Sequence, residues 1–334
     1  MARRLVMPEK RQITIEEFEP MRPLPGEVRV RALYSLMSTG TELTVFNQRF
    51  APGTHWEMFG QYPFRPGYTM VGEVEALGPE VDQPALGQRV AIRRSHASHH
   101  VLPAAACMPI PDGLDSKDAV WFALAKIGFR GSQAAGYRLG DHVMVIGAGP
   151  VGQMSVRWAQ AAGCWPIAVV DAVESRLDLA RQGGATTVIA KPIAQLIEDG
   201  AFADEAARPK IVIDTTGNPA VFSDALRVPA RFGRMVILGD TGMPQEMRMT
   251  SDVIRRGLTV VGAHDMQVRE GWKEQEIDEL FFQFALSGRF DLRGLNSHVF
   301  RPDDYQEAYE LADTRRGETM GIVFDWTGEG ARTA

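Results

Sequence analysis

The stretch Val143-Met-Val-Ile-Gly147-Ala-Gly149-Pro150-Val151-Gly152 decides the fold of this 334-residue chain. Its apolar start is too short for a helix and is typical of a buried strand, and glycines follow at the spacing GxGxxG. In that context Gly147 allows a tight turn, Gly149 lets the backbone approach a pyrophosphate, and Gly152 permits close packing of helix on strand. The phosphates would lie at the N-terminus of the helix that opens here. The stretch therefore predicts a dinucleotide site on a parallel sheet.

A second short apolar run, Ile167–Val170, is followed by Asp171, about 20 residues beyond Gly152, the spacing of the acid that binds an adenosine ribose. Its carboxylate can accept hydrogen bonds from both ribose hydroxyls and would repel a 2′-phosphate, so NAD is favoured over NADP. Arg176 could still accommodate that phosphate, which keeps NADP as the second candidate. The alternative is a glycine turn that binds nothing and an aspartate that caps the next helix.

Two further turns complete the predicted nucleotide site. They follow the fourth and fifth predicted strands, at the carboxyl ends where ligands bind in parallel sheets, although each could equally be a plain turn. The predicted cofactor-binding residues are Gly147, Gly149, Pro150, Val151, Gly152, Asp171, Arg176, Thr216, Gly217, Gly239 and Asp240.

The chain divides into two kinds of sequence. From Asp141 onward, short apolar runs alternate with segments of helical period, which predicts a parallel sheet covered on both faces. Residues before about Pro111 instead show alternating runs between Pro- and Gly-rich turns, which indicates antiparallel strands with long loops. The tail is too short for a domain of its own and is expected to return to the N-terminal part. The predicted parallel strands are Val143–Ile146, Ile167–Val170, Thr187–Ile189, Ile211–Ile213, Met235–Leu238 and Leu258–Val261.

These patterns predict an α/β chain with two domains. A β-rich domain would comprise residues 1–125 and 272–334, including a helix at Trp272–Ser287 and a strand at Gly321–Phe324. A Rossmann domain with a doubly wound, six-stranded parallel sheet would comprise residues 126–271.

Composition excludes several classes of protein. With Lys+Arg 36 against Asp+Glu 42, the net charge is −6, so the cationic surface that nucleic acid binding needs is not expected. No stretch reaches the roughly 18 apolar residues of a membrane span, and the N-terminus has no secretory apolar region. The two cysteines, Cys107 and Cys164, are too few for a disulfide framework. We therefore expect a cytoplasmic protein with a small-molecule substrate, no nucleic acid partner and no membrane association.

Over nearly its whole length the sequence resembles the medium-chain dehydrogenase/reductase family, which includes alcohol and polyol dehydrogenases. The resemblance is carried by Gly26-Glu-Val-Arg-Val-Arg-Ala, Pro66-Gly67-Tyr68-Thr69-Met-Val-Gly72-Glu-Val, Gly87-Gln-Arg-Val and the glycine motif. It implies a GroES-like catalytic domain, hydride transfer with a nicotinamide cofactor, and a homodimer or homotetramer. Residues 38–42 and 62–68 look most like the subgroup that contains bacteriochlorophyllide dehydrogenase.

The chain departs from the zinc-dependent members of that family. Where those carry Cys-Gly-Ser/Thr-Asp, Gly-His-Glu and a later Cys or Glu, this sequence has Thr39-Gly40-Thr41-Glu42, Gly67-Tyr68-Thr69 and Ala123-Leu124-Ala125-Lys126. A different register would place Met37 or Ser38 at the first position. Zinc takes thiolate, imidazole, carboxylate or water, and none of the aligned side chains is a good ligand. The departures predict an enzyme that works without zinc.

Tyr68 and Lys126 could replace the metal, because both fall at former ligand positions. Tyr68 would exchange the substrate proton, and the Lys126 ammonium would favour the phenolate of a group that ordinarily titrates near about 10. Alternatively, Tyr68 packs as an ordinary aromatic and Lys126 reaches the surface or pairs with a carboxylate. A hydroxyl of Thr39 or Thr41 could relay the proton, or could instead bond its own turn.

Other polar residues receive structural assignments. Glu42 aligns with a structural aspartate of the family, so we expect an ion pair with a basic residue. His99 and His100 would lie on opposite faces of a strand and cannot both line one site. For the cluster of His96, His99 and His100, solvated strand histidines are the favoured reading, with a substrate-facing acid/base as the alternative.

The resulting prediction is a zinc-independent, NAD(H)-dependent oxidoreductase that interconverts a secondary alcohol and a ketone on a sugar, cyclitol or natural-product intermediate. A zinc-free quinone or enone reductase using NAD(P)H is one alternative, and a noncatalytic NAD(H)-binding sensor is the other. The apolar strand Leu258–Val261 could pair with its twin in a dimer, or could simply be buried.

Overall fold

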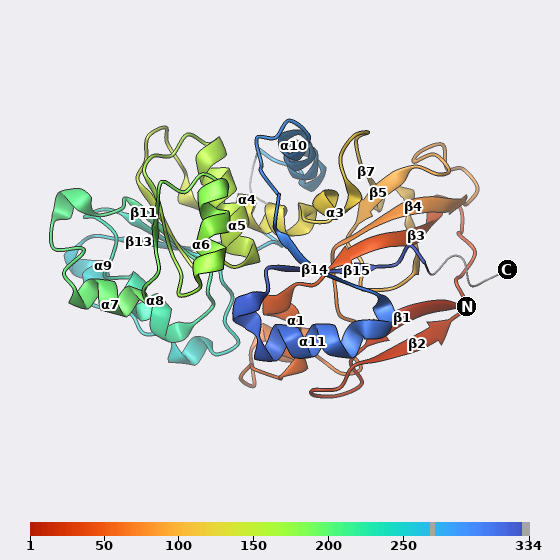
Figure 1. The fold of residues 1–334 in the computed structure, drawn as a ribbon, viewed down its shortest axis with the longest axis horizontal. Coiled ribbons are helices and arrows are strands. Elements are labelled where there is room, and N and C mark those ends of the chain that lie inside the picture. The colour runs from red at the N-terminus through yellow and green to blue at the C-terminus, as the bar shows by residue number, and fades with distance from the viewer. Residues whose placement is uncertain (268–270, 329–334) are drawn as a thin grey trace. The chain divides into compact units, whose positions relative to one another are not determined.

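The computed structural model describes residues 1–267 and 271–328, which form two compact units (Figure 1). We call Met1–Ala123, Asp278–Leu286 and the chain from Arg293 onward the β-rich unit, and Leu124–Ile277 with Ser287–Leu292 the parallel-sheet unit. Within the described residues, no helix has both the length and the apolar character needed to cross a bilayer.

The β-rich unit is built on a mixed sheet with the strand order β14-β15-β3-β4-β5-β7, and β6 also pairs with β3. Along β3, Val28, Val30 and Ala32 are buried while the residues between them are half-buried, so one face of this strand packs into the core. The strands are β1 (Ala2–Val6), β2 (Thr14–Phe18), β3 (Glu27–Leu36), β4 (Met70–Leu77), β5 (Arg89–Ile92), β6 (His99–Pro103), β7 (Met108–Pro109), β14 (Asn296–Phe300) and β15 (Gly321–Asp325).

The tail joins this sheet, because β15 pairs antiparallel with β3 and β14 pairs parallel with β15. Helix α1 (Thr39–Phe46), which follows β3, contacts α11 (Tyr305–Thr314) from the tail (Figure 1). The short helices α2 (His55–Phe59) and α3 (Ser116–Ala119) also belong to this unit. Segments from both ends of the chain therefore build one core.

The parallel-sheet unit has the strand order β10-β9-β8-β11-β12-β13, with every pairing parallel, which is the order of a doubly wound sheet. Along β8, Val143 and Val145 belong to one apolar core, and Met144 and Ile146 belong to another, so both faces are covered. The strands are β8 (Val143–Ile146), β9 (Ile167–Val170), β10 (Thr187–Ile189), β11 (Ile211–Asp214), β12 (Arg234–Ile237) and β13 (Thr259–Gly262). The helices after these strands are α5 (Pro150–Ala161), α6 (Glu174–Gln182), α7 (Ile193–Glu198), α8 (Pro219–Ala225) and α9 (Asp252–Arg255).

The two units divide inside helices α4 (Phe122–Ala135) and α10 (Glu274–Leu286). The sequence placed the first boundary at 125/126 and assigned all of 272–334 to the β-rich domain. In the structure, residues 124–125, 272–277 and 287–292 instead group with the parallel sheet. The physical reason at 287–292 is packing: the Phe290 ring lies 4.6 Å from that of Trp158, and Arg157 Nε donates to the Asp291 carbonyl at 2.7 Å.

Candidate functional site

The glycine loop between β8 and α5 has the geometry of a dinucleotide site. Gly147 has φ +91°, and a Cβ there would lie 2.7 Å from Thr215 Oγ1. A Cβ on Gly152 would lie 2.0 Å from the Gly147 carbonyl oxygen. Gly149 caps the N-terminus of α5, and a Cβ built there meets nothing within 4 Å. The first and third glycines are thus required by packing, while the second leaves room at the helix N-terminus for a phosphate.

Asp171 follows β9 and forms a hydrogen bond to this loop. Its Oδ2 accepts from the Ala148 N–H at 2.7 Å, and its Oδ1 accepts from the Val173 N–H at 2.8 Å. Burial lowers the pKa of Arg176, and the nearby Asp171 carboxylate opposes that shift. The Arg176 guanidinium therefore lies close enough to Asp171 for the two charges to interact. These residues fit a nicotinamide dinucleotide.

The turns after β11 and β12 meet each other. Gly217 has φ +62°, and a Cβ there would lie 2.6 Å from the Asp240 carbonyl oxygen, while a Cβ on Gly239 would lie 2.3 Å from the Gly217 nitrogen. Asp214 accepts from the Thr216 N–H at 2.8 Å and from its Oγ1 at 2.6 Å, and burial raises the pKa of Asp214. The structure thus brings Thr216, Gly217, Gly239 and Asp240 together at the carboxyl end of the sheet.

In the β-rich unit, Tyr68 belongs to a small group of hydroxyls. Its Oη lies 2.7 Å from Ser38 Oγ, and Ser38 Oγ donates to Thr41 Oγ1 at 3.3 Å. Ser38 caps helix α1, and Tyr68 precedes β4. The Arg93 guanidinium lies over the Tyr68 ring, with Cζ 4.8 Å from the ring centroid. The sequence singled out Tyr68 and Thr41, gave Ser38 only as another register, and missed Arg93.

Thr39, the other hydroxyl predicted as a relay, is the first residue of α1 and is buried. Its neighbour Ser38, and not Thr39, contacts Tyr68 in the described structure.

A buried polar network lies beside this group. Glu42 is fully buried and accepts from the Ser38 N–H at 2.7 Å, from the Tyr309 hydroxyl, and from His96 Nε2, which lies 3.2 Å from Oε2. His96 Nδ1 lies 2.7 Å from Ser35 Oγ. The solvated histidine expected at 96 is therefore wrong, because the ring is buried against a carboxylate. The basic partner expected for Glu42 is this histidine.

His99 and His100 sit on β6, and each has its own partner. His99 Nε2 lies 3.4 Å from Glu75 Oε2, whereas His100 Nε2 donates to the Ser95 carbonyl at 2.9 Å. Burial lowers the pKa of His100 to about 4. His100 is thus half-buried and neutral near pH 7, which also departs from the solvated reading.

Lys126 lies on α4 in the parallel-sheet unit and is only 4% exposed. Its Nζ lies 2.8 Å from Glu274 Oε1 and 3.3 Å from Asp265 Oδ1. Asp265 comes shortly after β13, so Lys126 belongs to the carboxyl end of this sheet. The ammonium is held by two carboxylates, which matches the structural alternative for this residue.

The residues at the family's zinc-ligand positions do not fit zinc. At the first position Thr39, or Ser38 in the alternative register, offers a neutral hydroxyl, and Ser38 bonds the Tyr68 hydroxyl at the second position. Lys126 offers a cation that is already paired. Thr69 Oγ1 donates to the Val120 carbonyl at 2.5 Å. Among residues 1–267 and 271–328, no group of three or more His, Cys, Asp or Glu side chains is placed to hold a metal ion.

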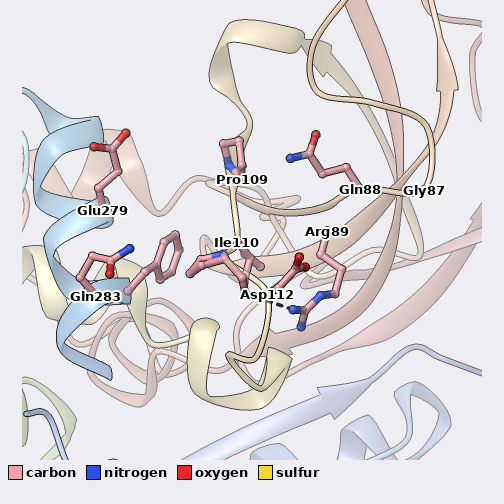
Figure 2. A pocket seen from close by; sticks show the side chains of 10 residues that line it. Gly87, Gln88, Arg89, Pro109, Ile110, Asp112, Glu279 and Gln283 are labelled. Atoms are coloured by element: carbon pink, nitrogen blue, oxygen red, sulfur yellow. Dashed lines mark hydrogen bonds between the residues drawn. The ribbon is translucent and has the colours of Figure 1, made fainter. Parts of the chain in front are cut away.

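A cavity of about 450 Å³ lies elsewhere in the β-rich unit, between the β5 and β7 segments and helix α10 (Figure 2). It contains none of the predicted site residues. Arg89, which lines it, donates to the Leu114 and Pro111 carbonyls and to Ser116 Oγ, so its guanidinium is committed to the fold. We assign this cavity no role in the chemistry.

Comparison with known proteins agrees with this geometry. A family model described as the alcohol dehydrogenase GroES-like domain matches residues 25–146, and one described as zinc-binding dehydrogenase matches 150–281. The chain is 27% identical over 350 residues to an L-threonine 3-dehydrogenase of Stenotrophomonas maltophilia, with 94% of this chain and 96% of that protein covered.

Solved structures show the same fold. An oxidoreductase/dehydrogenase of unknown specificity from Escherichia coli aligns with a TM-score of 0.82 and 21% identity, covering 97% of this chain and 99% of the other. A protein described as a short chain alcohol dehydrogenase from E. coli CFT073, complexed with NADH, aligns with a TM-score of 0.81, 19% identity and the same coverage. With both domain types matched in order and the nucleotide loop intact, the chain belongs to the medium-chain dehydrogenase/reductase superfamily and is an NAD(P)-dependent oxidoreductase.

Proposed function

We propose that this protein interconverts a secondary alcohol and a ketone with NAD(H), without zinc, and that Tyr68 exchanges the substrate proton. NAD would accept the hydride from the alcohol carbon, and the hydroxyl proton must then pass to a base. The observation that carries the proposal is the Tyr68–Ser38 hydroxyl pair, whose oxygens lie 2.7 Å apart. Tyr68 aligns with a metal-ligand position of the zinc-dependent family members, and Ser38 does so in one of the alternative registers. A tyrosine there can donate a proton to a ketone oxygen or take one from an alcohol.

Arg93 supports this role of Tyr68. A guanidinium stays protonated at every working pH, and a cation over the ring favours the phenolate over the neutral phenol. The Ser38 hydroxyl, which donates to Thr41 Oγ1 while Tyr68 is protonated, can turn its single proton to the phenolate oxygen. Lys126 remains the second candidate for this charge, although Glu274 and Asp265 already neutralise it.

The site supports NAD over NADP. The Asp171 carboxylate keeps lone pairs for ribose hydroxyls beyond the two backbone donors that it accepts, and its charge would repel a 2′-phosphate. A polar substrate is supported by the relative named for L-threonine, which carries a secondary alcohol at its third carbon. The resemblance to the bacteriochlorophyllide dehydrogenase subgroup rests on residues 38–42 and 62–68 and belongs to the same proposal.

We further propose a homodimer built on strand β13. This strand ends the six-stranded sheet, so a second copy would pair with its outer edge in antiparallel register. Thr259 on this strand is exposed, and Val260 and Val261 are half-buried. We also propose a cytoplasmic location for the protein.

The test uses the purified protein with NAD⁺ or NADP⁺ and a panel of secondary alcohols that includes L-threonine, and with NADH and a panel of ketones, quinones and enones. We expect alcohol oxidation and ketone reduction with NAD(H), unchanged by a chelator and without stoichiometric zinc in elemental analysis. Tyr68→Phe should lower kcat by about 100-fold or more. Chelator-sensitive turnover would contradict the zinc-free reaction, while enone reduction alone, or binding of NADH without turnover, would favour one of the two alternatives.

A further inference from the structure

We infer that Glu42, His96 and Tyr309 form a buried positioning network that holds the Ser38 hydroxyl against Tyr68. The inference rests on the proposed role of Tyr68 and adds residues that do not themselves meet substrate. All of them lie in the β-rich unit, and Glu42, His96 and Tyr309 are at most 1% exposed.

The hydrogen bonds of the network can be assigned a direction from its two ends. At one end, the Trp326 indole N–H can only donate, and it donates to Ser35 Oγ at 2.8 Å. At the other end, an ionised Glu42 carboxylate can only accept, so a neutral His96 carries its proton on Nε2, which faces Glu42 at 3.2 Å. Nδ1 of that tautomer accepts, and Ser35 Oγ donates to it across 2.7 Å.

Glu42 accepts from three donors in the described part of the chain. Burial first, and then the charge of Glu42, raises the pKa of Tyr309, so this phenol stays protonated and donates to Oε2. His96 Nε2–H is the second donor, and the Ser38 N–H at 2.7 Å from Oε1 is the third. An ionised carboxylate can accept all three, so the network is satisfied without water.

The same network fixes both members of the hydroxyl pair. The bond to Glu42 holds the backbone of Ser38 at the start of α1, with Ser38 Oγ 2.7 Å from Tyr68 Oη. The imidazole of His96 packs on Gly67, where a Cβ would lie 2.8 Å from the ring, and Gly67 directly precedes Tyr68. Because Ser38 meets Glu42 through its backbone N–H, the hydroxyl chain does not continue into the carboxylate. Glu42 therefore positions Ser38 and does not relay its proton.

The test is a double-mutant cycle read by phenolate absorbance during a pH titration, with the Tyr68→Phe protein subtracted in each background. It needs neither cofactor nor substrate. Burial raises the pKa values of Tyr34, Tyr62, Tyr137 and Tyr309, so these phenols ionise at a higher pH than an ordinary tyrosine. Ser38→Ala should raise the Tyr68 midpoint by about one pH unit, because the phenolate loses a donor. In the Glu42→Gln background the same substitution should have less than half that effect.

Removing the Glu42 charge also shifts the Tyr68 midpoint directly. That shift is the same with and without the Ser38 hydroxyl, so it cancels when the Ser38→Ala effects in the two backgrounds are compared. Asp313→Asn is the matched control: its side chain is also buried, pairing with Arg11 and Arg49, and it should leave the Ser38→Ala effect intact. An equal Ser38→Ala effect in the wild-type and Glu42→Gln backgrounds would overturn the inference. If Glu42→Gln does not fold, Tyr309→Phe takes its place, with the same result required. Wild-type turnover by Tyr68→Phe would refute the proposed function while leaving this coupling measurable.

Discussion

Two substitutions in the glycine loop should separate its packing role from its binding role. At Gly152 an added Cβ would lie 2.0 Å from the Gly147 carbonyl oxygen and 3.2 Å from Thr215 Oγ1. Ordinary contact begins near 3.4 Å, so α5 would have to move away from β8 by more than 1 Å. Overpacking of this kind costs about 1–3 kcal/mol, so Gly152→Ala should lower the denaturation midpoint.

At Gly149 the same methyl meets nothing within 4 Å, and φ is −68°. Gly149→Ala should therefore change the free energy of unfolding by no more than about 0.5 kcal/mol. The methyl would instead occupy space that a pyrophosphate needs at the helix N-terminus. Losing one or two phosphate hydrogen bonds, at about 1–3 kcal/mol in total, weakens NADH binding by about 10- to 100-fold.

The assays are urea denaturation followed by circular dichroism and NADH titration followed by fluorescence, with both variants measured in parallel. A Gly149→Ala protein that binds NADH as tightly as the wild type would refute the assignment of the open space to a phosphate. A Gly152→Ala protein with unchanged stability would refute the packing argument.

Three further outcomes are expected. Asp171→Asn should shift the ratio of the Kd values for NAD and NADP by about tenfold or more towards NADP, because the charge that repels the 2′-phosphate is lost; an unchanged ratio would contradict this. Burial lowers the pKa of His100 from 6.5 to about 4, so the unfolded chain binds the extra proton first and stability falls as the pH drops from about 6.5 to 4, by up to about 3 kcal/mol. His100→Gln should flatten that decline in denaturation midpoints, and an equally steep decline would argue against it. Thr259→Lys should convert a dimer to a monomer in light scattering, because each of the two paired β13 edges would gain a positive charge close to that of the other, whereas an unaltered mass would place any dimer contact elsewhere.

The parallel sheet could be predicted from sequence because its strands are buried on both faces. Val143–Ile146 and Ile167–Val170 are continuous apolar runs, and the structure has strands with the same bounds. Strand β1 was missed because Arg3 and Arg4 interrupt its apolar pattern. These arginines pair with Asp303 and Glu16, and no local sequence pattern predicts such partners.

In the candidate site, too, residues in a local motif could be predicted from the sequence, and partners that are remote in the sequence could not. The glycine loop and Asp171 follow a local spacing rule and were identified from sequence. The partners of Glu42 are remote, because His96 lies 54 residues away and Tyr309 lies 267 residues away. Arg93 reaches Tyr68 from the chain after β5, where no motif marks it. Only the folded sheet, which joins β15 from the tail to β3, could bring these groups together.

The partners of each cation favour Arg93 over Lys126 as the charge that acts on Tyr68. Glu274 and Asp265 lie within 3.3 Å of the Lys126 ammonium, so its charge is already paired with carboxylates. A cation paired in this way adds little to the stability of a phenolate. Arg93 lies over the aromatic face itself, 4.8 Å from the ring centroid, and belongs to the same unit as Tyr68. Removing Lys126 should therefore alter the carboxyl end of the parallel sheet, whereas removing Arg93 should raise the pH at which Tyr68 ionises.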